Sequence, residues 1–271
     1  MSDTDYNIKL YVSTFNSDTS WVRGGTRLEV GAAGRETPEG ALRDDTGDNI
    51  SEDNAYWGEL TGLYWIWKNV DFEPTDIVGF CHYNKCLDIS ERKLRETFRN
   101  HEKVWVVRDL TPIEKHTYPE DIEEYLKLLK EDYPEYYRSW NKLYTREGES
   151  RDWAANCCNC EMFYTTPDEL NRYCEFLFGS LSKLRAVVGD VDRERYHKRY
   201  CAFIGERLLS VYLMTNKRSF RQAYINANKS AVYSIVTRPV RGLLRAVGYE
   251  KSGTQRRIEE KLKLQNKSSY R

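Results

Sequence analysis

Short apolar segments with the composition of β-strands alternate along this chain with longer helical segments, and this alternation limits the folds open to it. Segments rich in β-branched and aromatic residues predict strands at 8–15, 27–32, 76–81, 103–107 and 161–165. Apolar side chains at helical spacing predict helices at 59–69, 119–144 with a break at Pro134, 167–188 and 200–215. This order predicts an α/β fold with a mixed, mostly parallel central sheet flanked by helices.

A single body of this kind suits the chain, because 271 residues with 40% hydrophobic content can bury one sizeable core. The net charge is zero, yet residues 216–271 contain 14 Lys and Arg against 3 Asp and Glu, so the preceding residues are acidic. An acidic body argues against a nucleic-acid partner, and a basic end predicts contact with something anionic.

The basic segment predicts a helix of its own. Apolar residues fall on one helical stripe at Val236, Val240, Leu243, Leu244 and Val247. Arginines fall on the opposite face at Arg238, Arg241 and Arg245. Such a helix can dock on the body or contact a membrane surface, and the sequence favours neither. We therefore divide the chain into a domain at 1–215 and a basic amphipathic helical tail at 216–271.

The N-terminal residues (MSDTDYNIK) form no apolar leader, and no run approaches the roughly 18 apolar residues of a membrane span. Seven cysteines, an odd number, suit a reducing compartment. We expect a cytoplasmic protein that its tail can hold at the inner face of the membrane. Cys157 and Cys160, with Cys158 between them, have the spacing of half a zinc site. No second pair follows, so structural thiols are favoured over zinc.

Residues 44–51 (DDTGDNIS) concentrate oxygen-bearing side chains just before a predicted helix. Asp44, Asp45, Asp48 and Asn49 can hydrogen-bond ribose and sugar hydroxyls, or their oxygens can hold a divalent metal. The alternative is an acidic turn with a helix cap, and the residue types alone favour this alternative.

Polar residues follow a buried strand at residues 79–85 (GFCHYNK). Ligands in open α/β sheets bind beyond the carboxyl ends of strands, so His82, Tyr83 and Lys85 are expected to face a site. Lys85 can neutralise a phosphate, and His82 can do the same or bind a metal. A purely structural role for His82 is an equally open alternative.

Charges within the apolar helix at 200–215 form a third candidate. Glu206 can act as a general base or bind a sugar, and Arg207 can bind a phosphate. A structural role for both, each paired with another element, is equally open. The common signatures GxSxG, GxGxxG, HExxH and the phosphate-binding P-loop are absent, which disfavours the familiar hydrolases, dehydrogenases and kinases.

Six blocks together resemble a bacterial family of capsular and exopolysaccharide biosynthesis proteins, long registered as a domain of unknown function. The blocks are VGAA at 30–33, DDTGDNIS at 44–51, ELTGLYWIWKN at 59–69, IVGFCHY at 77–83, MFYTTPDELNRYCEFLF at 162–178 and FIGERLLSVYL at 203–213. The resemblance spans roughly residues 7 to 215 and does not cover the tail. Its members resemble glycosyltransferases of the GT-A type, so it implies a GT-A-like domain.

The resemblance implies a nucleoside-diphosphate sugar as donor and co-substrate, with a UDP-sugar expected, and a glycan or lipid-linked glycan as acceptor. The family usually has two arginines after the His-Tyr pair, where this chain has Asn84 and Lys85. One positive charge and the bidentate fork of arginine are therefore lost. The chain also has Cys160 and Glu161 before Met162, where the family has an asparagine-bearing segment.

We predict a glycosyltransferase that transfers a hexose in surface polysaccharide synthesis. The expected catalytic residues are Glu206, Glu161 and His82. The residues expected to contact the nucleotide sugar are Ser13, Thr14, Asp44, Asp45, Asp48, Asn49, Glu59, Tyr64, Lys68, Tyr83 and Lys85. There is no clear DxD motif, so Mn²⁺ or Mg²⁺ remains an open cofactor with Asp48 and His82 as candidate ligands. The alternative is a non-catalytic glycan-binding or scaffolding protein, motivated by the missing arginine pair and the uneven charge.

Overall fold

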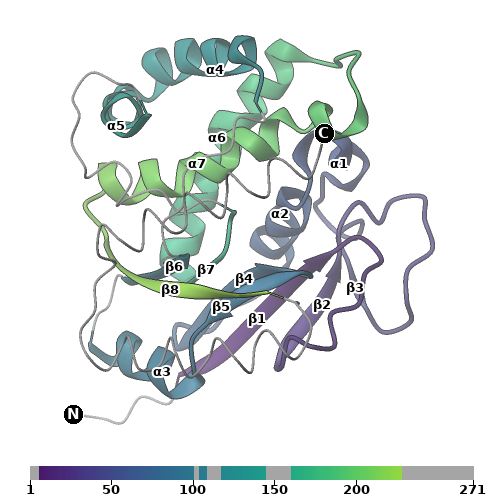
Figure 1. The fold of residues 1–271 in the computed structure, drawn as a ribbon, viewed down its shortest axis with the longest axis vertical. Coiled ribbons are helices and arrows are strands. Elements are labelled where there is room, and N and C mark those ends of the chain that lie inside the picture. The colour runs from purple at the N-terminus through teal and green to yellow at the C-terminus, as the bar shows by residue number, and fades with distance from the viewer. Residues whose placement is uncertain (1–5, 101–103, 109–116, 145–159, 228–271) are drawn as a thin grey trace, which may run out of the picture. The chain divides into compact units, whose positions relative to one another are not determined.

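A mixed eight-stranded sheet forms the centre of the described part of the chain, which comprises residues 6–100, 104–108, 117–144 and 160–227 of the computed structural model (Figure 1). Its strands are β1 (Asn7–Thr14), β2 (Gly25–Glu29), β3 (Leu42–Arg43), β4 (Asp76–His82), β5 (Lys85–Asp88), β6 (Val104–Arg108), β7 (Phe163–Thr165) and β8 (Ser219–Ala227). The helices are η1 (Ser51–Asp53), α1 (Asn54–Trp57), α2 (Leu60–Asn69), α3 (Glu91–Asn100), α4 (Pro119–Asp132), α5 (Pro134–Tyr144), α6 (Pro167–Val188), η3 (Arg195–Lys198) and α7 (Tyr200–Thr215).

The first strands of the sheet are parallel and the later ones are mixed. Strands β3, β2, β1 and β4 lie side by side in that order, all parallel. Strand β4 then pairs antiparallel with β7, which pairs antiparallel with β6, and β6 pairs in parallel with β8. Strand β5 turns back from β4 and pairs with β8. The α/β class predicted from the sequence is therefore confirmed.

Side chains alternate between two cores, one on each face of the sheet. On β4, Val78 and Phe80 join the core beneath α2, α6 and α7, whereas Ile77 and Cys81 join a smaller core that includes Leu94 and Phe98 of α3. Figure 1 shows α3 on one side of the sheet and the larger helices on the other, with α4 and α5 packed outside α6 and α7. The face of the sheet that is covered by α2, α6 and α7 therefore has helices opposite it, and a site can form between them.

Strand β8 continues the domain beyond Thr215, where the sequence analysis ended it. This strand pairs with both β5 and β6, so the compact unit runs through Ala227. The predicted tail helix and its apolar and arginine faces lie outside the described residues, as do Cys157 and Cys158. Within the described residues, no helix has the length and apolar character needed to cross a membrane.

Candidate functional site

One row of polar side chains crosses three strands at the carboxyl ends of β1 and β4. Ser13 is the register partner of His82 in the parallel pair, and His82 is the partner of Lys85 in the antiparallel pair. Register partners project to the same face of a sheet, so these three side chains share one face. It is the face covered by α2, α6 and α7, because Val78 and Phe80 alternate with His82 along β4.

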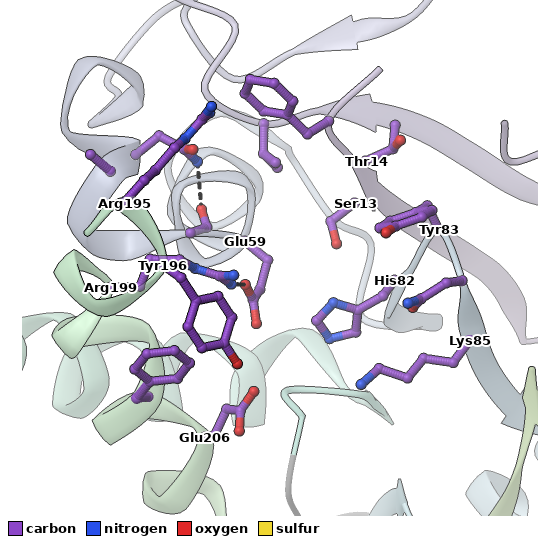
Figure 2. A pocket seen from close by; sticks show the side chains of 17 residues that line it. Ser13, Thr14, Glu59, His82, Tyr83, Lys85, Arg195, Tyr196, Arg199 and Glu206 are labelled. Atoms are coloured by element: carbon purple, nitrogen blue, oxygen red, sulfur yellow. Dashed lines mark hydrogen bonds and ion pairs between the residues drawn. The ribbon is translucent and has the colours of Figure 1, made fainter. Parts of the chain in front are cut away.

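This row forms one wall of a pocket with a volume of about 480 Å³. Figure 2 shows Ser13, Thr14, His82, Tyr83 and Lys85 on one side of it. The opposite wall comes from η3 and α7, far along the chain. Figure 2 shows Arg195, Tyr196, Arg199 and Glu206 on this wall, and Phe203 of α7 also lines the pocket. The pocket therefore unites the predicted strand-end residues with the predicted carboxylate of the apolar helix.

Glu59 joins the two walls at the start of α2. Its carboxylate accepts a hydrogen bond from the Arg199 guanidinium at 2.6 Å, and its side chain is 9% exposed. Gly58 makes this approach possible, because its φ is +54° and a Cβ there would lie 2.8 Å from a guanidinium nitrogen of Arg199. The predicted site residue Glu59 is therefore in the pocket, as an ion-paired carboxylate.

Two carboxyl groups of the pocket have opposite electrostatic environments. Burial opposes ionisation of Glu59, but the positive charges of His82 and Arg199 outweigh it and hold the pKa of the Glu59 carboxyl below its usual value. At Glu206, burial and then the charge of Glu59 raise the pKa to about 7. A carboxyl group with a pKa near neutrality can gain and lose a proton at physiological pH.

Glu161 lies inside the protein rather than on the pocket surface. Its side chain is fully buried, and the Tyr173 hydroxyl lies 2.9 and 3.0 Å from its two oxygens. Burial, and further the charges of Glu206 and Glu59, raise the pKa of Glu161 well above its usual value. Glu161 is therefore buried and is not among the residues that line the pocket, where its predicted catalytic role would require it to be.

Lys85 reaches across the pocket floor toward the start of β7. Its ammonium group donates a hydrogen bond to Cys160 Sγ at 2.9 Å, and Cys160 has a φ of +65°. Asn84 also lines the pocket. Asn84 and Lys85 therefore both lie at the site, and Lys85 supplies a cation on this wall.

Asp44 holds a loop together instead of facing the pocket. Its buried carboxylate accepts hydrogen bonds from the backbone N–H groups of Gly31 and Ala32 at 2.8 and 2.9 Å, and from the Ser51 hydroxyl at 2.5 Å. By accepting three hydrogen bonds, the Asp44 carboxylate satisfies donors in the turn after β2 and at the start of η1. These hydrogen bonds join the segment at 30–33 to the segment at 44–51.

The other residues predicted near the nucleotide sugar from this region also lie away from the pocket lining. Arg43 binds both oxygens of Asp45, at 2.9 and 2.6 Å. Asn49 accepts a hydrogen bond from the backbone N–H of Ser51. Asp48 accepts one from the Tyr64 hydroxyl at 3.1 Å, and Lys68 lies over the Trp67 ring. The predicted nucleoside contacts of this loop thus correspond to a structural network.

The described residues offer no ready-made metal site. Among them, no group of three or more His, Cys, Asp and Glu side chains is placed to hold a metal ion. The two candidate ligands are separated: Asp48 bonds to Tyr64, whereas His82 lies in the pocket. The cations Lys85 and Arg199 stand beside His82 and Glu59, and a metal ion would meet their repulsion. Among the described residues, the pocket lining therefore offers no group of side chains that would bind a metal ion.

Sequence reasoning missed the residues of η3. Arg195, Tyr196 and Arg199 line the pocket, and Arg195 is an exposed cation whose guanidinium lies 5.3 Å from the centre of the Phe15 ring. They belong to a polar segment, RERYHKR at 193–199, that has no strand or helix periodicity. The many basic and aromatic residues of this segment are the one feature of its sequence that could have indicated a binding site.

The fold is that of a GT-A-like glycosyltransferase. Among solved structures, the chain is similar to a protein described as the bifunctional glycosyltransferase WbbM in its apo form, with a TM-score of 0.65 and 21% sequence identity. The match covers 82% of this chain and 45% of that one, so this chain spans less than half of its length.

The sequence also matches a family profile described as a domain of unknown function (DUF4422), over residues 22–217. The chain belongs to this family, which confirms the resemblance found in the sequence. No curated protein matches the chain.

Proposed function

We propose that this protein is a glycosyltransferase that moves a hexose from a nucleoside-diphosphate sugar, expected to be a UDP-sugar, to a glycan or lipid-linked glycan acceptor in surface polysaccharide synthesis. The observation that carries the proposal is the pairing, across one pocket at the carboxyl ends of β1 and β4, of cations with a carboxyl whose pKa is about 7. Transfer from a nucleotide sugar needs both groups: positive charge for the leaving diphosphate and a base for the acceptor.

In this proposal the β1 and β4 wall holds the donor. Ser13 and Thr14, which line the pocket, would contact the nucleoside, and Tyr83 offers an exposed ring on the same wall. Lys85 and the exposed guanidinium of Arg195 offset the charge that develops on the diphosphate as its bond to the sugar breaks. His82 adds a further polar contact beside the diphosphate, and no step depends on a metal ion.

On the opposite wall, Glu206 is the general base. Its ionised carboxylate accepts the proton of the acceptor hydroxyl as that oxygen bonds to the sugar carbon and the nucleoside diphosphate departs. The Glu59–Arg199 ion pair positions the two walls, since it links the start of α2 to the start of α7. Figure 2 shows Glu206 across the pocket from His82 and Lys85, so in this proposal the donor sugar lies between them.

Nucleotide binding separates this proposal from a non-catalytic glycan-binding protein. UDP and uridine should be titrated against the wild type, Lys85→Met and Arg195→Met, with Lys183→Met on α6 as a control that removes an exposed lysine outside the pocket. We expect UDP to raise the unfolding temperature, each pocket variant to weaken UDP binding about tenfold, and uridine binding to change much less.

Turnover is then measured as nucleoside diphosphate released from a panel of nucleotide sugars with glycan acceptors. Release that requires an acceptor supports the transferase. The absence of both turnover and protection against unfolding, with every nucleotide sugar in the panel, would contradict the transferase proposal. Glycan binding without nucleotide binding would favour the scaffolding alternative.

A further inference from the structure

Four aromatic rings form a continuous strip that leads out of the pocket. The strip consists of Phe203 and Tyr196, which line the pocket, followed by His197 and Tyr118. Successive ring centres are 5.2, 5.4 and 5.6 Å apart. Tyr118 immediately precedes α4, so the strip connects α7 and η3 with a different part of the fold.

The strip gathers apolar surface that is otherwise scarce on the described part of the protein. The large hydrophobic side chains exposed there are Phe15, Tyr83, Tyr118, Val187 and Tyr196. All of them except Val187 belong to the pocket or to the strip. Exposed apolar surface that gathers in one place marks a binding site more often than scattered residues do.

An ion pair fixes the outer end of the strip. The Arg193 guanidinium lies 4.1 Å from the centre of the Tyr118 ring and donates hydrogen bonds to both oxygens of Asp121, which is buried on α4. The charge of Arg193 is therefore matched by a carboxylate, and the tyrosine is held in place before any ligand arrives. Rings that are already ordered lose little conformational freedom on binding.

We propose that this strip binds a glycan chain, so that the acceptor is the end of an oligosaccharide whose sugars behind the reacting one lie on Tyr196 and Tyr118. The C–H face of a sugar ring is apolar and can lie against an aromatic face, while its hydroxyls remain in water. Figure 2 shows the Tyr196 ring beside Glu206, so a chain on the strip ends near the proposed base. The inference rests on the proposed function, because it names the acceptor of that same site.

The test compares acceptors by length. Fragments of bacterial surface glycans with one, two and four sugars are titrated against the protein, and the same fragments are used as acceptors with an active donor. We expect affinity and kcat/KM to rise with length. Tyr118→Ala should lower both values for the four-sugar fragments by about three- to tenfold, the size expected for one lost aromatic contact, and so reduce the advantage of length.

Val187→Ala, which removes an exposed apolar side chain of α6 outside the strip, should behave as the wild type. Tyr196→Ala provides a second variant with the same expectation as Tyr118→Ala for long fragments. Affinity that is independent of length, or a length advantage that survives both tyrosine variants, overturns the inference.

The two proposals fail separately. If the protein binds nucleotide sugars but no glycan fragment, the proposal that the strip binds a glycan is wrong and the proposed donor site is still supported. If glycan binding depends on length but no nucleotide binds, the strip proposal is supported and the transferase proposal is wrong.

Discussion

At the scale of single residues, the sequence predicts which side chains line the pocket best where a side chain follows a buried strand. His82 and Lys85 are expected at a site because ligands bind beyond the carboxyl ends of strands, and the register places both of them beside Ser13. The acidic residues around Asp44 were assigned by composition, and the structure uses them to bond a loop. Composition cannot separate the two cases, because a carboxylate that accepts backbone hydrogen bonds and one that faces a ligand have the same side chain.

The pKa of Glu206 gives the first prediction. A general base acts in its ionised form, so activity should increase as the pH rises through about 7, the value to which burial and then Glu59 raise the pKa of Glu206. Glu206→Gln should remove this dependence and lower kcat by about 10²–10⁴-fold. Steady-state rates between pH 5 and 9 measure both effects.

Glu175→Gln on α6, a surface change outside the pocket, is the control. Retained nucleotide-sugar binding by Glu206→Gln would show that its pocket is intact. A Glu206→Gln rate within threefold of the wild type excludes Glu206 as the base.

The Glu59–Arg199 ion pair gives the second prediction. Arg199→Met leaves the Glu59 carboxylate buried without its guanidinium partner, which should cost about 3 kcal/mol of unfolding free energy. This is the lower end of the usual range, because the Arg199 side chain is 31% exposed. Urea denaturation measures the loss.

The pH dependence of that loss has a definite sign. The pKa of Glu59 is lowered in the folded state, so its contribution is present above the ordinary carboxyl pKa and disappears as the pH falls. The gap in stability between the wild type and Arg199→Met should therefore narrow in acid. Arg172→Met, which breaks an exposed pair with Asp168, should cost less than about 1 kcal/mol. An equal loss in both variants contradicts the special role of Glu59.

At the scale of elements, long helices with a broad apolar face were predictable and short or polar elements were not. The helices at 167–188 and 200–215 were predicted with the bounds that α6 and α7 have. Strand β5 has four residues, and α3 is largely polar. Strand β8 was missed because Ala223 is its one buried residue among those whose burial is described, so its sequence shows no alternation. Backbone pairing, which leaves no mark on side-chain pattern, determines such strands.

Strand β8 gives the third prediction. A chain that ends at Lys217 lacks this strand and exposes unpaired backbone on both β5 and β6. Such edges promote aggregation, so this variant should lack a cooperative thermal transition. A chain that ends at Ala227 keeps the strand and should unfold cooperatively. Circular dichroism and light scattering distinguish the two, and equal behaviour would show that β8 is dispensable.

At the scale of the whole molecule, the chain has basic residues in 216–271 and an acidic body. This separation of charge predicts that an anionic surface attracts the basic segment and not the body. The basic residues of 216–271 are each worth about 1 kcal/mol near anionic lipid, whereas the acidic body is repelled. The fourth prediction is that the full chain sediments with vesicles containing anionic lipid, and that a chain ending at Ala227 does not. Vesicles of neutral lipid are the control. Unchanged sedimentation after truncation contradicts the membrane prediction.

The two walls of the pocket come from separate stretches of the chain, and this has an evolutionary consequence. Most of the residues proposed to hold the donor lie between Ser13 and Lys85, with Arg195 as the exception, and the pocket residues proposed to meet the acceptor lie between Tyr196 and Glu206. Selection can therefore alter one specificity while the other is conserved, provided that the pair between Glu59 and Arg199 is kept. Chimaeras in which relatives exchange the segment that corresponds to residues 196–215, which leaves Arg195 in place, should inherit the acceptor of one parent and the nucleotide sugar of the other.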